Sequence, residues 1–291
     1  MNTIPPSGEP SEESWDLFIR PRNRWFELHL EDLWRYRDLL FLFVRRDFVS
    51  VYKQTILGPL WFFIQPIFTT IVFTVVFTGI ARVSTNGQPP MLFYLAGITC
   101  WNYFAACFTK TSTTFLSNAG IFGKVYFPRL ISPLSVVVSN LVQFGIQFLL
   151  FACFLGYHLI IGSPIAPSLS LIVFLTPVLL LIMGFMGLGL GILISAVTTK
   201  YRDFVFLVGF GVQLLMYATP VIYPTSAIPE KYRWLIEANP VAPIVEAFRT
   251  AYLGGDLSWS GLAYSAVFAL IVFIGGAGIF NRVEKTFMDT V

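Results

Sequence analysis

The chain has 291 residues, of which 56% are hydrophobic and only 12% are charged, and its formal net charge is +3. A soluble globular chain carries about 25% charged residues, so this composition excludes a soluble protein with an ordinary polar surface. The composition instead predicts an integral membrane protein with much of its surface facing lipid, in keeping with a mean hydropathy of +0.72.

The N-terminal part divides into a polar extension, residues 1–30, and a mixed segment, residues 31–53. The mixed segment intersperses apolar residues such as Trp34 with charged ones such as Arg37 and Asp38. This pattern predicts an amphipathic helix that lies in the membrane interface on the cytoplasmic side, and a simple basic anchor is the alternative. Because the basic residues are interleaved with acidic ones, we expect contact with membrane lipid and no binding of nucleic acid.

Uncharged apolar runs follow along residues 54–291, each long enough to cross a bilayer, which takes about 20 residues in a helix. The longest run, 130–199, contains no Asp, Glu, Lys or Arg and is divided by glycine and proline near its middle. We therefore predict an all-α integral membrane domain with six transmembrane helices. The predicted spans are 57–80, 91–113, 133–157, 169–196, 204–229 and 257–281.

The basic residues that separate these spans fall mainly on one side of the membrane. That side has the basic residues of 20–53, Lys124 with Arg129, Lys200 with Arg202, and Arg282 with Lys285, whereas the other has only Arg82, Lys231, Arg233 and Arg249. Cytoplasmic loops are enriched in Lys and Arg. The first side is therefore predicted to be cytoplasmic, with both termini inside the cell.

Two connecting segments are more apolar than ordinary loops. Residues 118–129 form a short cytoplasmic connection, and we expect Tyr126, Phe127 and Arg129 to dock on a partner protein or on the chain's own interface helix. On the other side, residues 220–255 contain five prolines yet stay apolar. This predicts short helices that dip into the outer leaflet and pack against protein. Glu246 and Arg249 stand three residues apart there. We expect them to form a structural ion pair, and a gate contact is the second interpretation.

The sequence carries no motif for chemistry of its own. It has no phosphate-binding loop of the Walker type, no catalytic constellation, and three cysteines without metal-ligand spacing. We expect no catalytic residue, no metal site and no cofactor in this chain, and an energy source supplied by another subunit. In the fourth span, Gly187 and Gly191 have the spacing that lets helices approach closely. We expect these glycines to pack helices within one subunit, and a dimer interface is the alternative.

A series of short segments stands in a fixed order along most of the chain. These segments are 33–40 (LWRYRDLL), 46–47 (RD), 52–61 (YKQTILGPLW), 65–66 (QP), 124–129 (KVYFPR), 201–203 (YRD), 219–224 (TPVIYP), 239–240 (NP) and 246–249 (EAFR). In these segments the chain resembles the permease subunits of bacterial ATP-binding-cassette (ABC) transporters, type 2, that export O-antigens, teichoic acids or capsules.

The resemblance implies the transmembrane channel subunit of an exporter that moves a lipid-linked polysaccharide from the cytoplasm to the outer face of the bacterial inner membrane. It also implies a homodimer of permeases with two cytoplasmic nucleotide-binding ATPase subunits, which hold ATP and Mg²⁺. A permease for drugs or small lipids is the alternative within transport. A membrane-bound sugar or acyl transferase is the alternative outside it.

The resemblance further assigns roles to particular residues. The ATPase-coupling positions are Arg45, Arg46, Asp47, Lys124, Tyr126, Phe127 and Arg129. The periplasmic re-entrant gate helices, between the fifth and sixth spans, include Trp234, Asn239, Pro240, Glu246 and Arg249.

A channel for a sugar chain is expected to have aromatic rings, on which sugar C–H faces stack, and amides along its wall. The candidates are Trp61, Phe62, Gln65, Phe68, Tyr94, Trp101, Gln213, Tyr217 and Tyr223. For each aromatic residue the alternative is a place in the lipid-facing belt or in packing. The two glutamines distinguish a channel wall from a lipid-facing surface better than the aromatic residues do, because an amide in a span needs a polar partner or a wet lumen.

Overall fold

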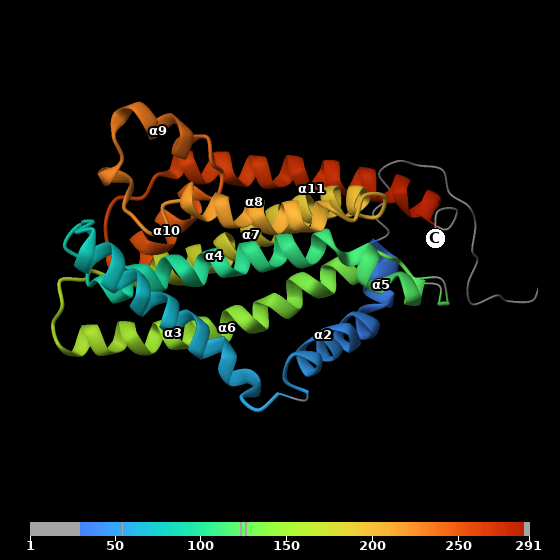
Figure 1. Ribbon diagram of the computed structural model, residues 1–291, viewed down its shortest axis with the longest axis horizontal. Coiled ribbons are helices and arrows are strands. Elements are labelled where there is room, and N and C mark those ends of the chain that lie inside the picture. The colour runs from blue at the N-terminus through green and yellow to red at the C-terminus, as the bar shows by residue number, and fades with distance from the viewer. Residues whose placement is uncertain (1–29, 54, 123, 126, 288–291) are drawn as a thin grey trace, which may run out of the picture.

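The computed structural model describes residues 30–53, 55–122, 124–125 and 127–287, and throughout these residues every regular element is a helix. Long helices run beside one another, with α5 at one end of the bundle and α9 and α10 at the other (Figure 1). The predicted extension 1–30 lies outside the described residues, apart from Leu30.

The elements follow the chain without a strand between them in the described part. They are α1 (Leu30–Arg35), α2 (Arg37–Tyr52), η1 (Gly58–Leu60), α3 (Trp61–Phe73), η2 (Thr74–Ile80), α4 (Pro90–Ser112), α5 (Thr114–Phe122), α6 (Ile131–Ile160), α7 (Leu169–Thr198), α8 (Phe204–Tyr217), η3 (Thr225–Ala227), α9 (Glu230–Glu237), α10 (Ala242–Leu253) and α11 (Trp259–Phe287). The η2 element is a π-helix that continues α3, so the two form one apolar helical segment with η1.

Five helices in the described part are long and apolar enough to cross a membrane, which agrees with five of the six predicted spans. Their bounds are Gly58–Ile80, Pro90–Ser112, Ile131–Ile160, Leu169–Thr198 and Trp259–Phe280. The long uncharged run is indeed divided, because α6 ends at Ile160 and α7 begins at Leu169.

The predicted span 204–229 is not one helix. Helix α8 has 14 residues and ends at Tyr217, so it is about 21 Å long, shorter than the roughly 30 Å of a hydrocarbon core. Pro220 disfavours the helical conformation at Thr219, because the proline ring collides with the preceding residue. The chain beyond α8 turns and forms the short elements η3, α9 and α10. Among the described residues, five helices rather than six are long enough to cross the membrane.

Helix α4 lies at the centre of the bundle and packs against α6, α7 and α10. Nearly every residue from Leu92 to Phe104 is buried. Close approach to α7 depends on glycine: a Cβ on Gly187 would lie 2.7 Å from Cys107 Cβ, and one on Gly191 would lie 2.5 Å from Thr111 Cβ. The packing of these two glycines within one subunit is thus confirmed. Helices α3 and α8, by contrast, keep most of their surface exposed.

The predicted interface helix, 31–53, corresponds to α1 and α2, which are separated at Tyr36. Helix α2 packs against α6. Its inner side contributes Leu39, Leu40 and the buried Phe43 to a hydrophobic cluster. Its outer side exposes Phe41 and Leu42 together with charged residues. Apolar residues on the outer side suit a helix lying in a membrane interface, and that placement stays a prediction.

Candidate functional site

The inner side of α2 meets the connection between α5 and α6 in an aromatic cluster. The rings of Phe43 and Phe127 touch edge to face with centroids 5.6 Å apart, and the rings of Phe122 and Phe127 are 5.7 Å apart. Phe43 and Phe127 are 6% and 4% exposed. We call α2, α5 and residues 127–131 the junction. Phe127 thus packs on the chain's own interface helix, one of the two partners expected for it.

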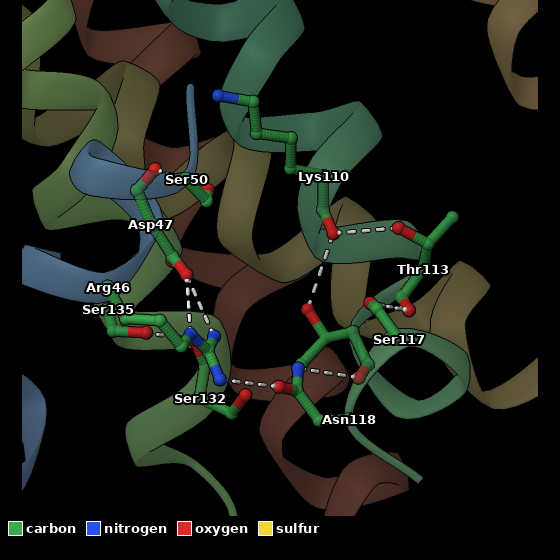
Figure 2. A network of polar contacts seen from close by, with 10 residues as sticks. Arg46, Asp47, Ser50, Lys110, Thr113, Ser117, Asn118, Ser132 and Ser135 are labelled. Atoms are coloured by element: carbon green, nitrogen blue, oxygen red, sulfur yellow. Dashed lines mark hydrogen bonds and ion pairs between the residues drawn. The ribbon is translucent and has the colours of Figure 1, made fainter. Parts of the chain in front are cut away.

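A polar contact lies beside these rings and ties α2 to α5 (Figure 2). The Arg46 guanidinium donates twice to Asp47 Oδ1, from Nε at 2.9 Å and from Nη2 at 2.8 Å. Its Nη1 donates to Asn118 Oδ1 at 3.3 Å, and its Cζ lies 4.5 Å from the centre of the Phe43 ring. Asn118 is held in turn, because its Nδ2 donates to the Thr114 carbonyl at 3.0 Å. One guanidinium therefore links α2 to α5.

The remaining coupling candidates lie differently. Arg129 places its Cζ 5.7 Å from the centre of the Phe122 ring. Arg45 and Lys124 are exposed, and Tyr126 lies outside the described residues. The structure thus brings Arg46, Phe127 and Arg129 to one place although they come from two separate segments.

Two residues of the junction, Phe43 and Asn118, were not singled out as site residues from the sequence. Asn118 is 7% exposed, and its amide within α5 was the available signal, since a buried polar side chain requires a partner. Phe43 stands three residues before Arg46, a spacing that places both on one side of a helix, but no local pattern distinguished it from its apolar neighbours.

The channel candidates fall into exposed and buried groups. On α3 the exposed residues Trp61, Gln65 and Phe68 recur at spacings of four and three, and therefore share one face of the helix. On α8 the exposed residues Gln213 and Tyr217 are four apart. Each of the two poorly covered helices thus presents an amide beside aromatic rings.

The other candidates are distributed differently. Tyr94 and Trp101 are 0% and 4% exposed and belong to the core around α4. Their assignment to a channel wall does not agree with the structure, because the central position of α4 surrounds them with protein; the Tyr94 hydroxyl lies 3.0 Å from Thr78 Oγ1. Phe62 is half-buried. Tyr223 is half-buried as well and donates its hydroxyl hydrogen to the Tyr217 carbonyl at 2.7 Å.

At the opposite end of the bundle, Asn239 fastens the start of α10 to the end of α8. Its Nδ2 donates to the Ala218 carbonyl at 3.0 Å and to Thr219 Oγ1 at 2.8 Å, and its Oδ1 accepts from the Val241 N–H at 3.0 Å. The next carbonyl, that of Pro240, accepts from the Ser265 hydroxyl of α11 at 2.7 Å. Trp234 of α9 is 65% exposed. Among the gate candidates, Asn239 and Pro240 are therefore anchored and Trp234 is not.

The expected ion pair between Glu246 and Arg249 is replaced by another arrangement. Arg249 is 5% exposed, and its guanidinium donates to the backbone carbonyls of Phe93, Pro220 and Val221. The Glu246 carboxylate is not among its hydrogen-bond partners, and the ion pairs in the described part do not include these two residues. Arg249 therefore joins α10 to α4 and to the chain after α8.

Burial shifts the pKa values of both Arg249 and Glu246. Burial lowers the pKa of Arg249 to about 9, and nearby Glu246 acts in the opposite direction, so the guanidinium is still cationic at neutral pH. Burial also raises the pKa of Glu246, with Arg249 opposing that shift. The carbonyl oxygens satisfy the buried cation in place of a carboxylate, and the half-buried Glu246 stays outside this set of hydrogen bonds.

Comparison with known proteins adds sequence likeness to this geometry. The model of the family described as "ABC-2 type transporter" matches residues 38–253. Two proteins of Klebsiella pneumoniae named "O-antigen export system permease protein RfbA" are 28% and 29% identical over 253 and 252 residues, covering 87% of this chain and 94% of each relative. A protein of the same name from Myxococcus xanthus is 27% identical over 265 residues, covering 90% of this chain and 98% of the relative.

Proposed function

The chain belongs to the ABC-2 type transporter family, and from this premise we propose that it is the permease subunit of an ATP-driven polysaccharide exporter. Three relatives that it matches over nearly their full length carry the name O-antigen export system permease. The five apolar helices long enough to cross a membrane make it a multi-pass membrane protein. We place it in the bacterial inner membrane, with the basic α2 and α5 end in the cytoplasm.

The energy for transport comes from ATPase subunits that this chain does not contain. The sequence has no Walker phosphate-binding loop, so ATP and Mg²⁺ are bound by two cytoplasmic partner subunits. The observation that carries this proposal is the junction, where Arg46 bonds Asn118 and Phe43 packs on Phe127. These contacts join the interface helix and the α5–α6 connection into one packed unit that an ATPase can push.

The path for the substrate lies between two copies of the chain. Helices α3 and α8 leave Gln65 and Gln213 exposed beside Phe68 and Tyr217. An amide facing hydrocarbon is unfavourable because its hydrogen bonds are unsatisfied there. A second permease and a hydrated lumen satisfy these amides, and the aromatic rings supply faces on which sugar rings slide.

The substrate is a lipid-linked polysaccharide, O-antigen-like or teichoic-acid-like, that moves from the cytoplasm to the outer face of the inner membrane. A pull-down of the solubilised chain from its native membrane tests the assembly: we expect two copies of the permease with a nucleotide-binding subunit. Recovery of the chain without any ATPase subunit would contradict the proposal.

The Arg46→Ala substitution tests coupling, and Arg37→Ala is its matched control. Arg37 lies on the same helix, and its replacement removes the same charge. Among the described residues, its contacts are with Trp34, at the carbonyl and the ring, and with the exposed Asp38, all outside α5. We expect Arg46→Ala to reduce export about tenfold, the equivalent of about 1.4 kcal/mol for one charge-assisted contact.

Arg129→Ala is expected to act in the same direction, because Arg129 lies over the Phe122 ring of the junction. The readouts are polysaccharide reaching the cell surface and ATP hydrolysis by the reconstituted complex. Normal export with normal stimulation of hydrolysis in both Arg46→Ala and Arg129→Ala would refute the coupling role of the junction.

A further inference from the structure

Two adjoining hollows open around α10, at the end of the bundle opposite the junction. One has a volume of about 220 Å³ and the other of about 400 Å³. Both are lined by Thr225, Pro243, Glu246 and Ser258, so they meet at the side of α10 that bears the Glu246 carboxylate. We call the two hollows together the α10 groove. The larger hollow falls within the range of about 300–1,000 Å³ that small-molecule sites occupy.

Hydrogen-bonding groups are dense along this groove. Carboxylates come from Glu237, Glu246 and Asp256, hydroxyls from Ser226, Ser258 and Ser260, and amides from Asn86 and Gln88. Thr225 lines both hollows, and its hydroxyl oxygen is buried without a hydrogen-bond partner in the described part of the chain.

Two aromatic rings complete the lining. Phe93 borders the first hollow, but it is 3% exposed and the Arg249 guanidinium lies over its ring, 3.6 Å from the centroid, whereas Tyr264 borders the second hollow. Tyr264 is 42% exposed, although its hydroxyl already donates to the Ala238 carbonyl at 2.9 Å. Its ring is therefore fixed in orientation while part of its surface stays accessible. The accessible ring of Tyr264 beside many polar groups matches the two sides of a sugar, whose C–H faces are apolar and whose hydroxyls both donate and accept hydrogen bonds.

The charge of the groove is predominantly negative. Arg249 is the one basic side chain among the described residues that line it, and the Arg249 donors are directed to backbone carbonyls. The other basic residues of this region, Arg82, Lys231 and Arg233, are not part of the lining. Carboxylates accept hydrogen bonds from hydroxyls but repel carboxylate or phosphate groups on a ligand.

We propose that the α10 groove binds sugar units of the exported polysaccharide as it leaves the permease, and that this polysaccharide is uncharged, without a carboxylate or phosphate in each repeat. The inference rests on the proposed export function and adds a subsite and a substrate class to it. It favours O-antigen-like chains of neutral sugars over teichoic-acid-like chains, which carry phosphate along their backbone.

Cysteine labelling in living cells tests occupancy of the groove. Ser258→Cys and Ser226→Cys place a thiol on its exposed lining, in a Cys153→Ser background because Cys153 is exposed whereas Cys100 and Cys107 are buried. Ser170→Cys, at the exposed start of α7 and outside the groove, is the control. Labelling with a membrane-impermeant maleimide is compared between cells that synthesise the polysaccharide and cells whose glycosyltransferases are deleted.

We expect labelling of both groove cysteines to fall about tenfold during export, as occupancy near 90% leaves only the free fraction reactive, and labelling of Ser170→Cys to stay unchanged. Glu246→Gln, which keeps the shape of the side chain, is expected to restore part of the lost labelling. Equal labelling of the groove cysteines in both strains, while export proceeds, overturns the subsite and leaves the export function intact.

Chemical analysis of the surface polysaccharide whose appearance depends on this chain tests the substrate class. Uronic acid and phosphate are expected to be absent from its repeat, and their presence in every repeat overturns the assignment of a neutral glycan. Deletion of this chain with no loss of any surface polysaccharide overturns the export function itself. If only the groove proposal fails, deletion of this chain still abolishes the surface polysaccharide, so the two failures are distinguishable.

Discussion

Gly97 of α4 is the position where one methyl group tests the packing of the buried arginine. A Cβ built on Gly97 would overlap Arg249 Nη2, and would lie 2.9 Å from the Val221 carbonyl oxygen and 3.2 Å from Arg249 Cζ. Non-bonded heavy atoms prefer separations of about 3.5–4.0 Å. The guanidinium must therefore shift, and the shift disturbs its hydrogen bonds to the Pro220 and Val221 carbonyls.

The expected magnitude for Gly97→Ala follows from these bonds. A hydrogen bond to a charged group contributes about 1.5–3 kcal/mol, so the loss of two costs about 3–6 kcal/mol. Alanine in a helix is favoured over glycine by about 1 kcal/mol, which leaves a net loss of about 2–5 kcal/mol. At roughly 2 °C per kcal/mol for a chain of this size, the melting temperature is expected to fall by about 4–10 °C.

The assay is thermal unfolding of the purified protein in detergent, and Gly145→Ala is the matched control. Gly145 is an exposed glycine of α6 with no atom within 4 Å of the position that a Cβ would take. The same chemical change there removes no contact and is expected to leave the melting temperature equal or slightly raised. A melting temperature of Gly97→Ala at or above that of Gly145→Ala would refute the account of Arg249 as a buried cation held by carbonyls.

Two further substitutions test the ends of the bundle. Phe127→Ala removes a 4%-exposed ring from the aromatic cluster and is expected to lower the stability by about 3–5 kcal/mol. The expected results are a lower melting temperature and faster proteolysis within α2. An unchanged rate of proteolysis within α2 would show that the ring does not hold the interface helix. Asn239→Ala leaves the Val241 N–H and the Ala218 carbonyl without the Asn239 side chain as partner, at a cost of about 1–3 kcal/mol. We expect faster hydrogen exchange in α10, measured by mass spectrometry. Exchange equal to that of the wild type would contradict the anchoring role.

Local composition determined where the membrane helices lie. The spans predicted at 57–80 and 169–196 begin and end within two residues of the helices Gly58–Ile80 and Leu169–Thr198. The prediction of these spans succeeds because each segment can be judged by itself. A run that crosses a bilayer must be apolar and long enough, and charge or proline must end it. The same reasoning failed for 204–229, because hydropathy does not register that Pro220 stops the helix while the apolar chain continues.

Roles that depend on a partner far along the chain were decided by the tertiary structure. Arg249 was expected to pair with Glu246, its neighbour on the helix, but its carbonyl partners stand up to 156 residues away and become accessible only because residue 97 has no side chain. Tyr94 and Trp101 carry the same aromatic character as Trp61 and Phe68, yet the central place of α4 buries the first two while α3 exposes the others. A sequence states which side chains need a partner, since that need is a property of the group itself. Which partner is within reach depends on how the helices pack, and in this protein that packing is set by glycine contacts such as Gly187 on Cys107, which join segments far apart in the chain.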